Sequence, residues 1–187
     1  FAMARAVAKH AAEFNAASPA LPCSINISPA SLEGADFPDL MAGAIHEAGL
    51  ACSQFTLELT EARQAEYGPR ALETMAALRA IGFGLSVDDF GAGQSNVDRL
   101  KTFPFTEVKI DPAFTRLALD EAFAKAAMVD CVKLAKKAGL RVVAKGVETK
   151  AMLDFLKDVG VDEVQGFLLS RPMPAADFRE LLAKGRP

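Results

Sequence analysis

The 187-residue sequence lacks the features that mark membrane and secreted proteins. No apolar run approaches the ~20 residues that a membrane-spanning helix needs, and no basic segment followed by an apolar one stands at the N-terminus as a secretion signal would. Positive charge is not in excess either: the formal net charge is -3, which disfavours a nucleic-acid polymer or an acidic membrane surface as a partner. We therefore expect a cytoplasmic domain without membrane contact, which meets any anionic ligand with a local group of charges.

Cysteine is also scarce. Cys23, Cys52 and Cys131 are an odd number, far apart and each in an apolar context, which predicts reduced, buried thiols rather than a disulfide framework or a zinc site. A hydrophobic content of 51% allows a substantial core, and a single domain over 1–187 is the default expectation. Because the chain opens at Phe1 inside a helical pattern, we expect it to be part of a larger multidomain protein.

Short apolar segments rich in β-branched residues alternate with longer segments of helical period. The predicted strands are 23–28, 55–61, 83–90, 107–111, 141–148 and 163–167. The predicted helices are 2–16, 37–49, 69–81, 119–138, 149–159 and 175–184, several of them closed by glycine. Such alternation predicts a parallel sheet covered by helices, either an open doubly wound sheet or a (β/α) barrel.

Polar residues at the ends of these strands favour the barrel. They stand at or near the C-terminal end of every predicted strand: Asn26, Glu58, Asp88, Asp89, Lys109, Lys145 and Gln165. A TIM-like (β/α) barrel assembles its active site from the C-terminal ends of all its strands, which we call the mouth, whereas an open sheet uses one crevice. We therefore predict an α/β fold of the barrel type, with the first strand or strands missing from this chain because a complete barrel has eight.

Several of these side chains offer oxygen ligands. Asn26, Glu58, Asp88 and Asp89 carry the amide and carboxylate oxygens that Mg²⁺, Mn²⁺ and Ca²⁺ take. Each of them alone serves equally well as a helix cap or a partner of loop amides. Converging carboxylates, however, repel one another unless a cation neutralises them. The pattern therefore implies either a divalent metal or a lysine at the mouth.

Two further segments accompany the acids. Lys109 points either into the mouth or outward to solvent, and strand alternation, which places Lys109 and Asp111 on the face of Glu107, favours the mouth. The loop FGAGQSN, with Gly91 and Gly93, either wraps a phosphate or makes a tight turn. Both segments are therefore candidates for ligand binding.

The motifs SINIS, ELTE, DDFGAG, KID, KGVET and QGF resemble, in order and spacing, those of EAL domains. These domains are phosphodiesterases that linearise the bacterial second messenger cyclic di-GMP. The resemblance implies a (β/α) barrel that holds two divalent metals, Mg²⁺ or Mn²⁺, and directs a metal-bridged water at one phosphodiester. It also implies that Asn26, Glu58, Asp88 and Asp89 are metal ligands, with Asp88 bridging and Asp89 serving the second metal.

The resemblance extends to further site residues. Lys109 resembles the lysine that holds the nucleophilic water and the phosphate, Glu61 the acid that anchors the DDFGAG loop, and Glu148 the later acid of the KGVET motif. Gln165 is similar to a residue that lines the mouth, where Asp111, Gly91 and Gly93 are also expected to contact ligand. A homodimer is plausible by the same resemblance.

Two departures from the family pattern bear on activity. The Glu-Ala-Leu signature is absent from the sequence, and Lys145 stands where the family's AEGVET motif has a glutamate that serves the second metal and has been assigned as general base. A protonated lysine has no lone pair and carries the opposite charge, so one metal or none is expected here. Alternatively, Lys145 points outward, or Glu148 takes over the missing role.

Three hypotheses follow. The leading one is a degenerate EAL domain, inactive or impaired, that acts as a cyclic di-GMP receptor or an interaction module within a larger signalling protein. The second is an active phosphodiesterase that produces linear pGpG. The third is a scaffold that has lost nucleotide binding. The direction of the Lys145 side chain distinguishes the first two: contact with Asp88 and Asp89 favours the degenerate domain.

Overall fold

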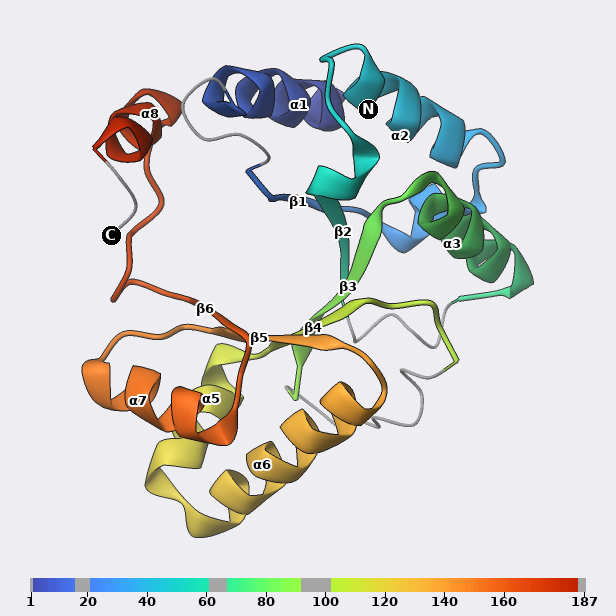
Figure 1. Ribbon diagram of the computed structural model, residues 1–187. Coiled ribbons are helices and arrows are strands. Elements are labelled where there is room, and N and C mark those ends of the chain that lie inside the picture. The colour runs from blue at the N-terminus through green and yellow to red at the C-terminus, as the bar shows by residue number, and fades with distance from the viewer. Residues whose placement is uncertain (1, 16–20, 61–66, 92–101, 185–187) are drawn as a thin grey trace. The chain divides into compact units, whose positions relative to one another are not determined.

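The computed structural model describes residues 2–15, 21–60, 67–91 and 102–184 (Figure 1). Its strands follow the chain order within one sheet: β1 (Cys23–Asn26), β2 (Phe55–Thr60), β3 (Gly84–Phe90), β4 (Glu107–Ile110), β5 (Arg141–Lys145) and β6 (Glu163–Gln165). The pairings β1–β2, β3–β4, β4–β5 and β5–β6 are parallel. Parallel strands in chain order, with helices between them, are the predicted arrangement.

The chain divides into two compact units. Unit 1 comprises 1–58, 66–85 and 172–187, and unit 2 comprises 59–65 and 86–171. We describe each unit by itself. The expectation of a single domain over 1–187 stays a prediction.

In unit 1, the helices are α1 (Ala2–Asn15), α2 (Phe37–His46), α3 (Pro69–Ile81) and α8 (Ala175–Ala183), with short 3₁₀ helices at Pro29–Glu33 and Cys52–Gln54. Helix α1 buries a stripe of small residues at helical spacing, Ala4, Ala8 and Ala11. Its last turn packs edge-to-face on α8, with the rings of Phe14 and Phe178 5.1 Å apart between centroids. The two ends of the described chain therefore meet in this unit.

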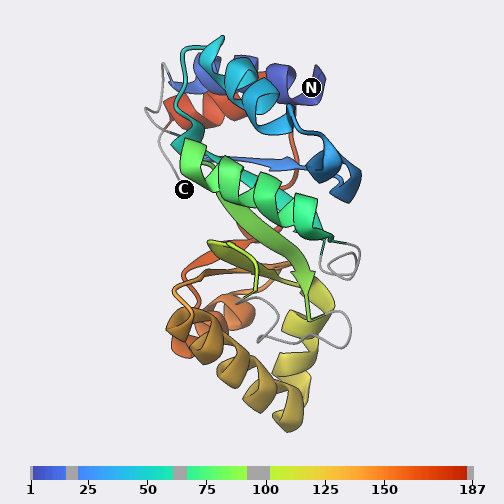
Figure 2. The same ribbon diagram turned by 90° about the vertical axis from the view of Figure 1, so that its right-hand side faces the viewer.

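In unit 2, the helices are α5 (Pro112–Asp120), α6 (Ala122–Lys137) and α7 (Lys150–Val159). They lie together on one side of strands β4, β5 and β6 (Figures 1 and 2). All four residues of β4 and the middle three of β5 are buried, so these strands contribute to the core. Met128 of α6 and Leu156 of α7 are among the fully buried core side chains.

The predicted helix over 119–138 corresponds to α6, which begins at Ala122 after Glu121, a residue with extended backbone. Helix α5, which ends at Asp120, was not predicted. Asp111 caps α5: its carboxylate accepts the amide protons of Ala113 at 2.6 Å and Phe114 at 3.4 Å. The Asp-Pro pair at 111–112 is a typical start signal of a helix, and it could have revealed α5 in the sequence.

The predictions about membrane spans and thiols are partly tested. Within the described ranges, no helix is long and apolar enough to cross a membrane. The three cysteines are free; Cys52 and Cys131 are buried and Cys23 is half-buried. Burial raises the pKa of the Cys23 thiol and, against one backbone hydrogen bond, that of Cys52.

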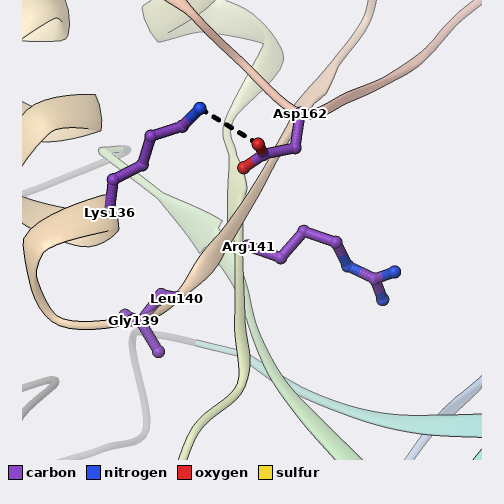
Figure 3. A pocket seen from close by; sticks show the side chains of 5 residues that line it. All are labelled: Lys136, Gly139, Leu140, Arg141 and Asp162. Atoms are coloured by element: carbon purple, nitrogen blue, oxygen red, sulfur yellow. Dashed lines mark ion pairs between the residues drawn. The ribbon is translucent and has the colours of Figure 1, made fainter.

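An open pocket lies at the turn between α6 and β5, lined by Lys136, Gly139, Leu140, Arg141 and Asp162 (Figure 3). Its charged groups are engaged with protein partners. Lys136 pairs with Asp162 at 3.0 Å, and Arg141 pairs with Glu107 at 2.6 Å and Glu163 at 2.9 Å. Because Lys136 and Arg141 are already paired with carboxylates, they are poorly placed to bind an anionic ligand. We therefore interpret the pocket as a structural feature and not as a ligand site.

Asp162 in this pocket gives a prediction of pH-dependent stability. Burial alone would raise its pKa, but the amide of Val142, 2.9 Å from Oδ2, and the ammonium of Lys136 outweigh burial and lower the pKa. A lowered pKa stabilises the fold above the pKa of the unfolded chain, about 3.9, and this stability is lost as pH falls through the folded-state value. We expect Asp162→Asn to cost about 1 kcal/mol at pH 7, with the difference shrinking in urea titrations as pH falls below about 3.9.

The matched control is Asp154→Asn. Asp154 also pairs with a lysine, Lys150, at 2.7 Å, but both side chains are exposed. This change should cost only a few tenths of a kcal/mol at any pH. Equal losses for the two variants would contradict the role given to the Val142 amide.

Candidate active site

The site is built on an irregularity at the end of β3. In the pairing with β4, Val87 lies opposite Val108 and Phe90 opposite Ile110, so β3 has one residue more than β4 over this stretch. Asp89 accommodates the extra residue with a left-handed backbone, φ 57°, which aspartate tolerates better than most residues. In a regular strand, Asp88 and Asp89 would point to opposite faces; here a β-bulge lets both carboxylates reach one partner.

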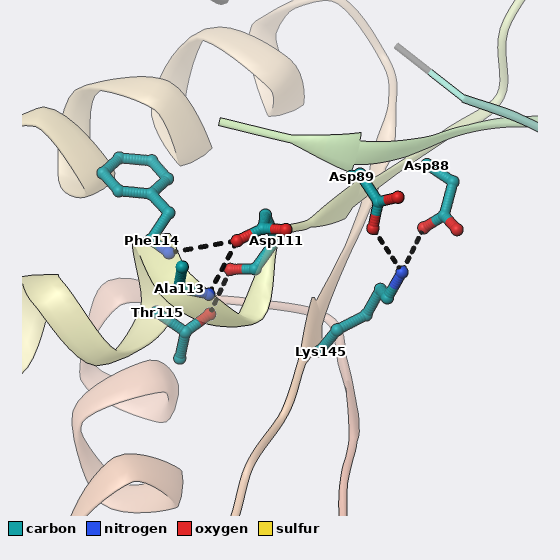
Figure 4. Close-up of polar contacts among 7 residues, drawn as sticks. All are labelled: Asp88, Asp89, Asp111, Ala113, Phe114, Thr115 and Lys145. Atoms are coloured by element: carbon teal, nitrogen blue, oxygen red, sulfur yellow. Dashed lines mark hydrogen bonds and ion pairs between the residues drawn. The ribbon is translucent and has the colours of Figure 1, made fainter. Parts of the chain in front are cut away.

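That partner is Lys145, the last residue of β5. Its ammonium donates to Oδ1 of Asp88 at 2.7 Å and to Oδ1 of Asp89 at 2.8 Å (Figure 4). The Lys145 side chain is 20% exposed and that of Asp88 12%, so the three charges form a half-buried cluster. Lys145 therefore points at the two aspartates and not into solvent.

The charge state of this cluster follows from its contacts. Burial works against the Lys145 ammonium, but hydrogen bonds and charge attraction from Asp88 and Asp89 outweigh it and raise the Lys145 pKa. A raised pKa means that the ion pairs are fully present at neutral pH and are lost only as pH rises through the folded-state value, above 10.5. Lys145 is thus a permanent cation under physiological conditions.

Close packing of backbone segments fixes the position of Lys145. Gly146 follows it with φ 72°, and a Cβ atom built there would lie 2.5 Å from Cβ of Pro112. At Gly91, which follows β3, a Cβ atom would lie 2.5 Å from the ring of Phe114. The segments after β3 and β5 thus both rest on the start of α5, and a side chain at either glycine would push them apart.

The remaining predicted residues of unit 2 lie at the same ends of the strands. Lys109 is 8% exposed, so it does not extend outward to solvent. Gln165 is exposed and is the register partner of Lys145. Asp111 directs its carboxylate to the start of α5 (Figure 4). Glu148 is exposed and lies 3.9 Å from Arg116, a residue of α5 that no sequence motif had singled out.

Two predicted metal ligands belong to unit 1. Asn26 and Glu58 are register partners near the C-terminal ends of β1 and β2, Glu58 being buried and Asn26 exposed. Strand pairing thus makes these two residues neighbours in the sheet. Glu61 and Gly93 lie outside the described residues, and their roles stay predictions, as do the metal-binding roles of Asn26, Glu58, Asp88 and Asp89.

A divalent metal at the aspartate pair would have to compete with Lys145. A metal ion held by Asp88 and Asp89 needs their oxygen lone pairs, and an Oδ1 atom of each is occupied by Lys145. The ammonium has no lone pair to contribute as a ligand. In the described part of the chain, no three His, Cys, Asp or Glu side chains form a metal-binding group.

Comparisons with known proteins decide the family. The EAL domain profile matches residues 1–172. The chain belongs to the EAL domain family. It is 35% identical over 155 residues to the oxygen sensor protein DosP of Escherichia coli, and 36% over 152 residues to the bifunctional diguanylate cyclase/cyclic di-GMP phosphodiesterase MucR of Pseudomonas aeruginosa. These matches cover 83% and 81% of the chain.

Solved structures of EAL proteins agree with this chain over most of its length. The PaMucR phosphodiesterase in complex with c-di-GMP gives a TM-score of 0.83 at 32% identity, covering 94% of this chain and 71% of that one. The manganese/cy-diGMP complex of Klebsiella pneumoniae BlrP1 gives 0.84 at 32% identity, covering 91% and 43%. The predicted α/β fold of the TIM-like (β/α) barrel class is thereby confirmed.

The chain spans only 19% of the length of DosP and 22% of that of MucR. The activities of these whole proteins are therefore not transferred with the EAL assignment. The chemistry of this chain has to be argued from its own residues.

Proposed function

We propose that this EAL domain binds cyclic di-GMP but hydrolyses it slowly or not at all, and serves as a receptor or regulatory module. One observation carries the proposal: the Lys145 ammonium lies 2.7 and 2.8 Å from the two aspartates that the family pattern gives to metal. We infer the ligand from the family relationship, because similar EAL structures are complexes with c-di-GMP.

The loss of hydrolysis follows from charge and lone pairs. In an active family member, divalent metals would clamp the attacking and leaving oxygens, and a carboxylate would take the proton of the attacking water. Here Lys145 takes up lone pairs of Asp88 and Asp89, and as a protonated amine it cannot accept a proton. We expect one Mg²⁺ or Mn²⁺ ion, or none, and a rate lowered by several powers of ten.

Binding of the ligand need not be lost with catalysis. Relative to a glutamate, a lysine at this position changes the local formal charge from -1 to +1, a difference of two units in favour of a phosphate anion. Lys109, buried on the adjacent strand β4, adds a second cation. With Asp88 and Asp89, the four groups sum to zero charge, so phosphate would meet no net repulsion from them.

A calorimetric titration of the full-length protein with cyclic di-GMP, followed by chromatography of the mixture in Mn²⁺, tests the proposal. We expect binding heat and an intact cyclic dinucleotide after hours of incubation. Rapid appearance of linear pGpG would refute the loss of activity. The absence of heat would refute the receptor role and favour a scaffold that acts through protein contacts.

The second candidate is an active phosphodiesterase. The pairing of Asn26 with Glu58 and the burial of Lys109 favour it, because this part of the expected machinery is retained. It requires another group, such as Glu148, to do the work of the missing carboxylate, and Glu148 lies beside Arg116. The same chromatography distinguishes the two candidates. The homodimer and the cytoplasmic location stay predictions.

A further inference from the structure

The Asp88–Asp89 turn brings two negative charges together. The bulge and the left-handed backbone of Asp89 bring two consecutive carboxylates to one side, at a place where Asp88 is nearly buried. Two carboxylates so close repel each other, and the repulsion is stronger where water is partly excluded. A group of positive charge between them would relieve this repulsion in the folded state.

Lys145 meets this need from within the chain. Its ammonium contacts both carboxylates, and its backbone is fixed by the packing of Gly146 against Pro112. The position is prepared on folding, and no ion has to be captured from solution. A divalent ion that bound the same two Oδ1 atoms would first have to break both ion pairs and leave an ammonium next to a doubly charged metal.

We propose that Lys145 is a tethered cation that takes the place of a divalent metal at the Asp88–Asp89 turn, so that the folded turn does not depend on the supply of divalent ions. Where the proposed function also holds, the binding of cyclic di-GMP at this mouth is likewise independent of Mg²⁺ and Mn²⁺. The occupancy of the site by cyclic di-GMP then depends on the concentration of the dinucleotide and not on that of divalent metal ions.

Thermal unfolding of the full-length protein tests the turn without any nucleotide. In EDTA, we expect Lys145→Met and Lys145→Glu to unfold at a temperature lower by about 5 °C and by more than 5 °C, respectively, because each leaves the aspartates unpaired. Saturating Mn²⁺ should restore several degrees to Lys145→Glu, whose new carboxylate completes a metal site, and much less to Lys145→Met. Lys145→Glu should also retain one more Mn²⁺ ion per chain than the wild type after desalting.

Lys150→Glu is the matched control. Lys150 makes an ion pair of the same 2.7 Å length with Asp154, but on the exposed surface of α7, so its charge reversal should change neither metal content nor the response to Mn²⁺. Unchanged unfolding of Lys145→Met in EDTA, or no additional Mn²⁺ in Lys145→Glu, would overturn the proposal.

Binding measurements with cyclic di-GMP, in EDTA and in Mg²⁺, distinguish this proposal from the proposed function. We expect the affinity of the wild type for cyclic di-GMP to agree within about twofold between EDTA and Mg²⁺. Binding that appears only with Mg²⁺ would overturn metal independence while leaving the receptor role intact. If no nucleotide binds in either condition, the receptor role fails, and the unfolding measurements still decide whether Lys145 replaces a metal.

Discussion

Lys145→Glu is expected to raise the rate of cyclic di-GMP hydrolysis by the full-length protein about a hundredfold or more in Mn²⁺. The change removes the ammonium that occupies Asp88 and Asp89 and adds a carboxylate at the end of β5. It thus supplies both a further metal ligand and a proton acceptor, neither of which lysine can provide. Chromatographic measurement of linear pGpG against time gives the rate.

Two variants show which part of the change matters. Lys145→Gln removes the positive charge without adding a carboxylate, so it should free the aspartates but recover much less activity than glutamate. Lys150→Glu makes the same charge reversal on the surface of α7 and should leave the rate unchanged. A wild-type rate already equal to that of Lys145→Glu would mean that another group performs the work of the missing glutamate.

The architecture was largely predictable from the sequence. Apolar β-branched segments alternate with segments of helical period, and this order indicates parallel strands covered by helices. The glycines predicted to close helices do so: Gly82 after α3 and Gly160 after α7 both have left-handed backbones. Helix α5 was missed because only Glu121 separates it from α6, and periodicity alone does not show where one helix gives way to another.

The position of the candidate residues at strand ends could be predicted from the sequence, but the geometry of their contacts could not. Position in the sequence placed Lys145 at the end of a strand, and the structure shows it paired with Asp88 and Asp89. Strand alternation, however, would have separated these two aspartates onto opposite faces. The bulge that unites them depends on the register with β4, which is a property of the strand pair and leaves no signal within β3 itself. The contact between Arg116 and Glu148 could not be predicted for a similar reason, since only folding brings α5 next to Glu148.

Gly166→Ala is expected to destabilise the protein by about 3 kcal/mol, because it forces backbone apart at the end of β6. A Cβ atom at Gly166 would clash with the carbonyl oxygen and the amide nitrogen of Val147. These atoms cannot rotate away as a side chain would, and both are engaged: the Val147 amide donates to Gln165 at 3.1 Å and its carbonyl accepts from Leu168 at 3.0 Å. The free energy of unfolding in urea measures the loss.

Gly43→Ala is the matched control, because it makes the same substitution at a position with free space and is expected to stabilise the protein. Gly43 lies within α2, and a Cβ atom there would meet nothing within 4 Å, so alanine should stabilise the protein by about 0.5–1 kcal/mol through its higher helix propensity. Because the two variants add the same methyl group, effects of opposite sign would show that the loss at Gly166 comes from its surroundings and not from the methyl group itself. A loss of less than about 1 kcal/mol in Gly166→Ala would show that the segment after β6 can move away from Val147 and does not hold the end of β5, where Lys145 stands, in place.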